Sequence, residues 1–114
     1  MIHRGDICWA ALPEPRGSEP GYRRPVLVVG ADEFNRSAIR TVMVVPVTSS
    51  TRLAKAPGNV LLGRGDTGLR KDSVANVSQV ITLDRSFLSA DSSRSLSARL
   101  MHRVDSGLRL ALSL

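Results

Sequence analysis

Short apolar runs of strand length dominate the first 83 residues of the chain. The run Asp6–Leu12 (DICWAAL) places the β-prone Ile7 and Trp9 two residues apart, which is the spacing of side chains on one face of a half-buried strand. Two further runs, 25–30 (PVLVVG) and 41–47 (TVMVVPV), are almost continuously apolar. Such runs are typical of strands that are buried on both faces, as in a small barrel.

The segments around these runs carry turn and loop residues. Residues 13–24 hold three prolines and two glycines, which predicts a long, shaped loop of the kind that carries function on a rigid scaffold. Residues 31–40 are expected to form one helical turn and a loop. A short strand is expected at 59–62, and β-type alternation resumes over 73–83. Because Pro46 cannot donate a backbone N–H, it predicts an edge or a bulge near the end of its strand.

The last part of the chain changes to a helical period. Ser97 is a good N-cap, and Leu96 is placed to contact Met101 as a hydrophobic staple, so the helix is expected to start at Ser97. Gly107 costs this helix about 1 kcal/mol relative to Ala and indicates a close packing contact. Strands followed by one helix predict a mainly β (α+β) fold, a small antiparallel β-barrel with the helix packed on it. The apolar stripe of the helix consists of Leu96, Leu100, Val104, Leu108 and Leu112, with Met101 and Ala111 beside it.

Composition bounds the core and adds a strong basic charge. The 114 residues suit a single domain, 1–114. Because 42% of the residues are hydrophobic and only 4% are aromatic, the core is expected to be aliphatic. Sixteen basic residues against ten acidic ones give a net charge of +6, and fourteen of the sixteen are arginine. The planar guanidinium fork matches phosphate, so this balance fits a binder of nucleic acid. Because the arginines are scattered, a solvated basic surface explains the charge equally well.

Several classes of protein find no support in the sequence. No window approaches 18 consecutive apolar residues, and the N-terminus lacks the apolar run of a signal peptide, so a cytoplasmic protein without a membrane partner is expected. Cys8 is the single cysteine, which excludes a disulfide framework or a cysteine zinc site within one chain. Its place in an apolar strand pattern predicts a core residue.

Four segments of the chain carry a resemblance to a known family. The stretch RGDICWAALPEPRGSEPGYRRPVLVV resembles the opening of the MazF/PemK family of toxin endoribonucleases, with its GDIxW, GSE and RP motifs in order. VVPVTSS, DSVANVSQVITLD and the terminal VDSGLRLALSL match the family in the same order. The resemblance therefore covers essentially the whole chain.

This resemblance implies a fold, an activity and partners. The fold is a five-stranded SH3-like barrel related to CcdB, and the assembly is a homodimer. The activity is that of a type II toxin, which cleaves single-stranded RNA (mRNA, or tRNA or rRNA) without a metal or cofactor and leaves 2′,3′-cyclic phosphate and 5′-hydroxyl ends. The partner is a MazE-like antitoxin whose tail folds across the RNA groove. Two alternatives stay open: a CcdB-like poison of DNA gyrase, and a non-catalytic RNA-binding relative.

The same resemblance assigns catalytic roles to two residues. Arg24 matches the family's catalytic arginine, and Thr48 matches its catalytic threonine. Cleavage of RNA by its own 2′-hydroxyl places negative charge on the phosphate oxygens, so fixed donors aimed at these oxygens are needed. Arg24 supplies charge and forked donors. Pro25 fixes the entry into the strand, and this entry aims Arg24 at a phosphate. The Thr48 hydroxyl is expected to donate to a non-bridging oxygen, helped by Ser49.

RNA-binding residues are expected in the loop and in the strand segment NVSQV. Ser18 and Glu19 fall in the GSE motif, where the family's loop lines the RNA groove, although turn chemistry alone also explains Ser18. Arg23 either contacts RNA or only adds to backbone attraction. Ser78 stands before Gln79 where many relatives carry an acidic residue. A serine cannot act as a carboxylate base, so proton removal falls to another group, to water or to electrostatics alone, while Gln79 is retained to read a base edge or position the loop.

The two histidines are not expected in the site. His3 lies near the N-terminus, and His102 lies in the terminal helix off its apolar stripe. Neither occupies a site position of the family. Without a cluster of ligands, the sequence predicts no metal site.

Overall fold

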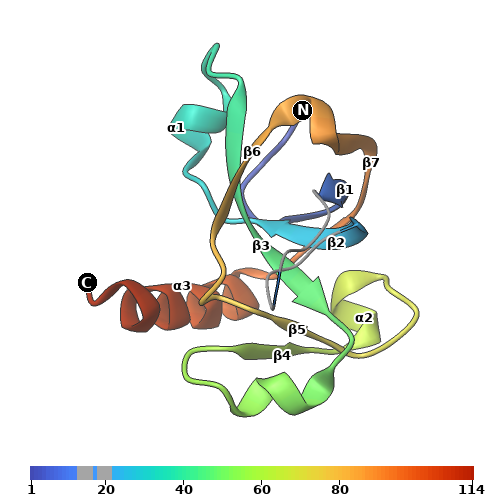
Figure 1. Cartoon of the computed structure of the whole chain (residues 1–114), viewed down its shortest axis with the longest axis vertical. Coiled ribbons are helices and arrows are strands. Elements are labelled where there is room, and N and C mark those ends of the chain that lie inside the picture. The colour runs from blue at the N-terminus through green and yellow to red at the C-terminus, as the bar shows by residue number, and fades with distance from the viewer. Residues whose placement is uncertain (13–16, 18–21) are drawn as a thin grey trace.

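The computed structural model describes residues 1–12, 17 and 22–114, which form strands and short helices followed by one long helix (Figure 1). The strands are β1 (Asp6–Leu12), β2 (Tyr22–Val28), β3 (Thr41–Thr48), β4 (Val60–Leu62), β5 (Ser73–Ala75), β6 (Ile81–Asp84) and β7 (Leu88–Ser95). The α-helices are α1 (Asp32–Asn35), α2 (Arg64–Thr67) and α3 (Ala98–Leu112), and the 3₁₀ turns are η1 (Thr51–Lys55) and η2 (Arg85–Phe87).

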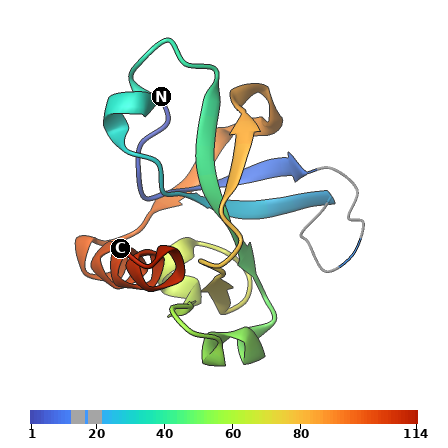
Figure 2. The ribbon, with the colours of Figure 1, turned by 60° about the vertical axis from the view of Figure 1, so that its left-hand side comes forward.

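All strand pairs are antiparallel, and they follow one curled path. The order along the sheet is β4-β5-β3-β2-β1-β7, and β6 pairs with β3 beside this path. Figure 2 shows β1 and β2 side by side, extending away from α3. The predicted mainly β barrel with a C-terminal helix is confirmed.

β3 changes its partner at Pro46. Its residues 41–44 pair with β6, and Val47 and Thr48 pair with β5, while β2 pairs on the other side. The Pro46 carbonyl accepts a hydrogen bond of 3.0 Å from the Asn76 backbone N–H. The missing proline N–H therefore falls between two pairings of an interior strand, and the expectation of an edge strand is wrong.

Two segments differ from the sequence expectation of strands. The run 73–83 forms two strands, β5 and β6, because its ends pair with different parts of β3 and residues 76–80 turn between them. β7 was not expected, since its sequence LSADSSRS is polar, yet it pairs with β1 through two shifts of register. These segments raise the number of strands among the described residues to seven, against the five that the resemblance implied.

Aliphatic side chains fill two clusters on opposite faces of the curled sheet. One cluster contains Ile7, Leu27 and Val45 with the α3 residues Leu100 and Val104. The other contains Cys8, Val26, Val28, Val44 and Leu83. Along β1, Cys8, Ala10 and Leu12 are buried on one face, whereas Trp9 is half-buried and Ala11 is exposed on the other, as expected for a half-buried strand. The core position of Cys8, 3% exposed, is confirmed.

Helix α3 begins where the sequence predicts. The Ser97 hydroxyl accepts a hydrogen bond of 3.3 Å from the Leu100 N–H, as an N-cap does. A Cβ on Gly107 would lie 2.0 Å from the Gly58 carbonyl oxygen, so the close contact predicted at this glycine is confirmed. The last turn of the stripe does not pack, since Leu112 is 56% exposed. Of the described helices, none is long and apolar enough to cross a membrane.

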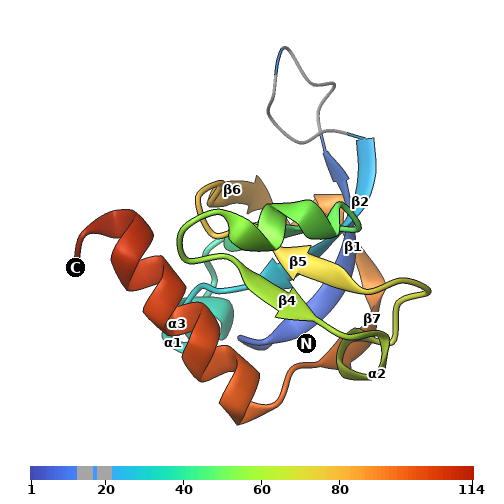
Figure 3. The same cartoon turned by 90° about the horizontal axis from the view of Figure 1, so that it is seen from below.

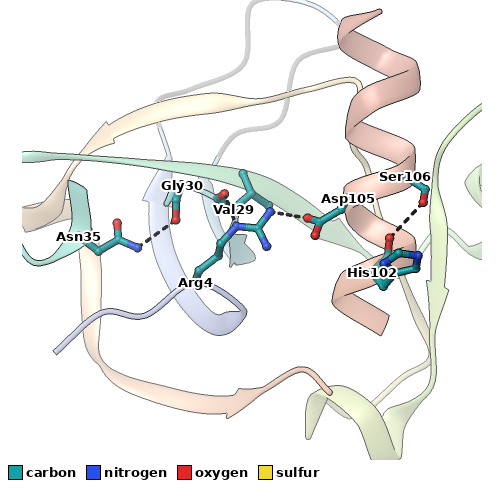
Figure 4. Close-up of polar contacts among 7 residues, drawn as sticks. All are labelled: Arg4, Val29, Gly30, Asn35, His102, Asp105 and Ser106. Carbon is teal, nitrogen blue, oxygen red and sulfur yellow. Dashed lines mark hydrogen bonds and ion pairs between the residues drawn. The ribbon is translucent and has the colours of Figure 1, made fainter. Parts of the chain in front are cut away.

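Arg4 ties the N-terminal segment to the end of β2 and to α3 (Figure 4). Its backbone N–H donates to Asp32 at 2.7 Å, its Nε donates to the Val29 carbonyl at 2.9 Å, and its guanidinium forms an ion pair with Asp105. The Arg4 N–H and then the Asn35 amide lower the pKa of Asp32 below its ordinary value. This end of β2 is a closed set of polar contacts, whereas its other end carries Arg23 and Arg24.

Candidate functional site

Arg23 and Arg24 stand at the start of β2, opposite the small side chains of β1. The register pairs Arg23 with Ala11 and Arg24 with Ala10. Both arginine side chains are exposed. Because strand pairing begins before Pro25, the ladder with β1 holds the backbone of both arginines, in addition to the proline.

The register between β2 and β3 leads Arg24 to Thr48. The ladder between β2 and β3 ends at the pair Val26 and Pro46, and Arg24 and Thr48 each lie two residues beyond this pair. Thr48 Oγ1 accepts a hydrogen bond of 3.1 Å from the Ser50 backbone N–H. This bond orients the hydroxyl and leaves its hydrogen available for donation to a ligand.

A first cavity of about 420 Å³, called the polar groove, contains Arg24 and Thr48. Its other polar lining residues in the described part of the chain are Asn59, Asn76, Ser78 and Gln79. The structure thus brings four of the residues proposed from the sequence, Arg24, Thr48, Ser78 and Gln79, to one groove. Apart from Arg24, the described lining residues are uncharged.

Asn59 and Asn76 were missed by the sequence reasoning, and they hold the polar groove together. The Asn59 amide donates to the Leu53 carbonyl at 2.9 Å and to Asn76 Oδ1 at 3.4 Å, and its Oδ1 accepts from the Val77 N–H at 3.0 Å. The Ser78 hydroxyl donates to Asn76 Oδ1 at 3.1 Å. This network joins η1 to the turn after β5, and Figure 3 shows η1, the green helical turn, beside β5.

A second cavity of about 620 Å³, called the basic groove, lies on the other side of Arg24. Arg24 and Val47 line both grooves, so the two cavities meet at these residues. None of the described residues that line the basic groove is acidic. Its polar and aromatic lining consists of Trp9, Arg23, Arg24, Ser49, Arg70, Lys71 and Ser73.

The lining of the basic groove differs from the site proposed from the sequence: Ser49 lies apart from Thr48, and two further cations are present. Ser49 lines this groove rather than the groove that holds Thr48. The Arg23 guanidinium lies over the Trp9 ring, 4.7 Å from its centroid. Arg70 and Lys71 were missed, although the adjacent cations in GLRKD were a signal in the sequence.

The remaining proposed residues lie outside these two grooves. Ser18 and Glu19 fall outside the described residues. His3 and His102 line neither groove, and His102 is an exposed residue of α3 whose carbonyl accepts from Ser106 (Figure 4). Within residues 1–12, 17 and 22–114, no three His, Cys, Asp or Glu side chains gather closely enough to hold a metal ion.

The geometry suits a phosphate at the junction of the grooves. A guanidinium that lines both cavities offers a forked, permanently charged donor, and the Thr48 hydroxyl is the second donor on the same groove wall. Cations on one side and neutral amides and hydroxyls on the other extend the contact surface beyond one phosphate. A chain of phosphates with bases between them has this distribution of chemistry.

Comparison with known proteins agrees with this chemistry. The family of PemK-like, MazF-like toxins of type II toxin-antitoxin systems matches residues 3–112. The chain is 46% identical over 114 residues to endoribonuclease MazF6 of Mycobacterium tuberculosis, covering 100% of this chain and 99% of the relative. It is 35% identical over 114 residues to endoribonuclease EndoA of Bacillus subtilis, covering 100% of this chain and 97% of the relative.

Solved structures share the fold. MazF of Deinococcus radiodurans superposes with a TM-score of 0.80 at 24% identity, covering 99% of this chain and 97% of that one. A mycobacterial endoribonuclease in complex with its cognate antitoxin gives a TM-score of 0.78 at 23% identity, covering 100% and 97%. The match over nearly the whole chain, together with relatives at this level of identity, places this protein in the family of PemK-like, MazF-like toxins of type II toxin-antitoxin systems.

Proposed function

We propose that this toxin endoribonuclease cleaves single-stranded RNA without a metal ion, at the point where the two grooves meet. The ribose 2′-hydroxyl attacks the adjacent phosphorus in line, the bond to the 5′-oxygen breaks, and the products carry a 2′,3′-cyclic phosphate and a 5′-hydroxyl. The observation that supports this reaction is the position of Arg24 in the lining of both grooves, with Thr48 on the wall of one of them.

Arg24 and Thr48 take different parts in this chemistry. The Arg24 guanidinium stabilises the charge that develops on the non-bridging oxygens, and it donates a proton to the leaving 5′-oxygen that it regains from water. Because a guanidinium keeps its proton at neutral pH, it does not act as a base there. Thr48 donates its hydroxyl hydrogen to a second phosphate oxygen.

The proton of the 2′-hydroxyl is passed to water in this proposal. The described lining of the two grooves contains no aspartate, glutamate or histidine, and Ser78 stands where many relatives carry an acid. A carboxylate base from the described lining is therefore not part of the mechanism. Glu19, outside the described residues, is the remaining carboxylate that the family resemblance brings to RNA, and its role here is binding.

The remaining roles concern binding and assembly. Ser18, Glu19, Arg23, Ser49, Ser78 and Gln79 contact RNA in this proposal. The whole chain, 1–114, acts as one domain in the cytoplasm and forms a homodimer. A MazE-like cognate antitoxin inhibits it, as supported by the mycobacterial endoribonuclease and the MazF of D. radiodurans, whose structures contain an antitoxin.

The test is cleavage of a long RNA by the purified protein in EDTA, followed by mapping of both ends of every product. We expect discrete cuts, cyclic phosphate at the 3′ ends and hydroxyl at the 5′ ends. A strict requirement for Mg²⁺ would contradict the mechanism. Intact RNA together with broken DNA in a gyrase assay would favour the CcdB-like alternative, and RNA binding without any cut would favour the non-catalytic one.

A further inference from the structure

The basic groove contains an aromatic surface that the proposed cleavage chemistry does not use. Trp9 is half-buried in the groove wall, where β1 pairs it with Pro25, and it is the single tryptophan of the chain. Its neighbours along β1, Cys8 and Ala10, are buried in the core. Trp9 is therefore held rigidly by the strand while part of its ring faces the groove.

Cations surround this ring. Arg23 lies over it at 4.7 Å from the centroid, and Arg24, Arg70 and Lys71 line the same cavity. Exposed aromatic rings combined with cations along a groove are how proteins bind single-stranded nucleic acid, because every base has a flat face and every linkage has a negative charge. A volume of about 620 Å³ is large enough for a nucleotide.

We propose that Trp9 and Arg23 form a stacking site for one nucleobase of the RNA substrate, and that Arg70 and Lys71 contact the phosphates next to it. This inference rests on the proposed function, because Arg24 belongs to both grooves and fixes the scissile phosphate between them. The base at Trp9 belongs to a nucleotide on one side of the scissile phosphate. Nucleotides on the other side enter the polar groove.

The chemistry of the groove favours RNA over a peptide as the occupant of this site. The Arg23 guanidinium is planar and lies over the indole, so a base can replace it on the ring or lie beside it there. The four cations of the described lining match the regular charge of a nucleic-acid backbone. A peptide would need acidic residues at matching intervals to satisfy them.

Trp9 itself is the probe for the test, because no other tryptophan contributes to the fluorescence. The ligand is an oligoribonucleotide that contains the chain's own mapped cleavage site, with a 2′-deoxy nucleotide at the scissile position so that the nucleophile is missing. We expect quenching of Trp9 on binding. An abasic nucleotide at one position next to the scissile phosphate should abolish the quenching, and abasic nucleotides elsewhere should leave it.

Variants complete the test. We expect Trp9→Leu to weaken RNA binding about 5- to 100-fold, Trp9→Phe to retain most of the affinity, and the abasic ligand to bind the parent and Trp9→Leu equally. Turnover at saturating RNA should change little, so the loss appears in KM. If Trp9→Leu does not fold, the abasic series on the parent protein decides the question alone.

Two results would overturn the stacking site. One is a folded Trp9→Leu protein with unchanged affinity for the RNA ligand. The other is quenching that survives an abasic nucleotide at every position of the RNA, which would indicate a distant change in the protein. Quenching by an antitoxin peptide, without quenching by any RNA, would have the same meaning. Because cleavage of the unmodified RNA is measured in the same preparations, a failure of the stacking site is distinguished from a failure of the nuclease function.

Discussion

The two grooves that meet at Arg24 differ in almost every chemical respect. The basic groove contains an indole ring and three cations besides Arg24, whereas the described lining of the polar groove adds only amides, hydroxyls and apolar side chains to it. Cations attract any phosphate backbone, so the basic groove contributes affinity that falls with salt. Amides and hydroxyls form directional hydrogen bonds, so the polar groove contributes geometry. In the proposed function, affinity and geometry are therefore supplied from opposite sides of Arg24.

The two grooves also rest on different parts of the fold. The basic groove is built by the start of β2, its partner β1, Val47 and Ser49 at the end of β3, and residues 68–73. The polar groove depends on Asn59, which follows Gly58, and the Gly58 backbone touches Gly107 of α3. Gly58 has φ of +81° and space for no side chain, because a Cβ there would lie 2.9 Å from the Gly107 carbonyl oxygen. Changes in α3 should therefore reach the polar groove first.

The largest effect is expected where the grooves meet. Arg24→Ala removes the charge that both grooves share, and loss of a fixed donor at the reacting phosphate typically lowers the rate about 100-fold or more. RNA binding should survive, because the other cations of the basic groove remain. The measurement is the single-turnover cleavage rate beside the RNA dissociation constant. Near-normal cleavage by folded Arg24→Ala would show that the reaction takes place elsewhere.

The next effect separates the supports of the two grooves. In Gly107→Ala, the new Cβ would lie 2.0 Å from the Gly58 oxygen, and this clash outweighs the helical preference of Ala, which is about 1 kcal/mol. We expect a loss of at least about 2 kcal/mol in the free energy of unfolding, or about 10 °C in Tm. Cleavage should fall more than Trp9 quenching by RNA does, because the clash falls on Gly58, directly before the polar-groove residue Asn59.

Gly65→Ala is the matched control for this helix substitution. Gly65 lies in α2, and a Cβ there meets no atom within 4 Å. The control should keep or slightly raise Tm, since Ala is the better helix former. A Gly107→Ala protein as stable as this control would mean that α3 shifts freely and does not fix the loop of the polar groove.

A smaller effect is expected inside the polar groove. Asn59→Asp keeps the acceptor for the Val77 N–H but loses the donors to Leu53 and Asn76, and it sets a negative charge beside Asn76 Oδ1. We expect about a tenfold loss of kcat/KM with most of the affinity for RNA retained, because the groove is displaced while the cations stay.

Asn35→Asp removes amide donors of the same kind far from both grooves. The Asn35 amide donates to the Gly30 carbonyl at 3.0 Å and to Asp32 at 3.0 Å. This control should lose stability without losing cleavage at a temperature where it is folded. Equal losses of kcat/KM in both variants would assign the Asn59 effect to general stability and not to the groove.

The sequence predicted the strands and the helix whose buried side chains form an apolar pattern. It did not predict the strand that is defined only by its hydrogen-bonded pairing. β1, β2, β3 and α3 were recognised from their apolar period. β7 has a polar sequence and is held by the edge of β1, so no local pattern marks it. The alternating pattern of the run 73–83 continues through its turn. Only the structure shows that it forms two strands, because its two ends pair with different segments of β3.

The candidate site was predictable where motifs carry it and not where closure of the barrel builds it. Arg24 and Thr48 were proposed from the family resemblance, and they line one groove because each lies two residues beyond the last pair of the β2–β3 ladder. Trp9 has the spacing of a strand residue, so the pattern could not show that its ring lines a groove. Asn59, Arg70 and Lys71 come from turns, and their common surroundings depend on long-range pairing that a local window does not contain.

The smallest effect is expected at the rim of the polar groove, where Ser78 stands at a position for which the family resemblance implied an acid. Ser78 is exposed, and its hydroxyl donates to Asn76 Oδ1 at 3.1 Å, so the groove is arranged around a donor at this position. Ser78→Glu loses this donor, places a carboxylate beside an acceptor and repels phosphate. We therefore expect RNA affinity to fall about two- to fivefold, with no gain in rate, since one charge changes the net balance of +6 only slightly.

Ser78→Ala separates the two causes, because it loses the donor without adding a charge. If Ser78→Glu loses RNA affinity and Ser78→Ala does not, the loss comes from the added charge. It should then become smaller as the salt concentration rises, since screening weakens the repulsion between the carboxylate and the RNA. Both variants are compared with the parent in single-turnover rate and RNA affinity on the parent's own mapped target. A faster rate for Ser78→Glu at unchanged affinity would contradict the expectation. It would mean that the polar groove still accommodates a carboxylate base. The uncharged side chains that distinguish this groove from the basic groove would then reflect the loss of a catalytic group in this chain, and not a groove rebuilt around a serine.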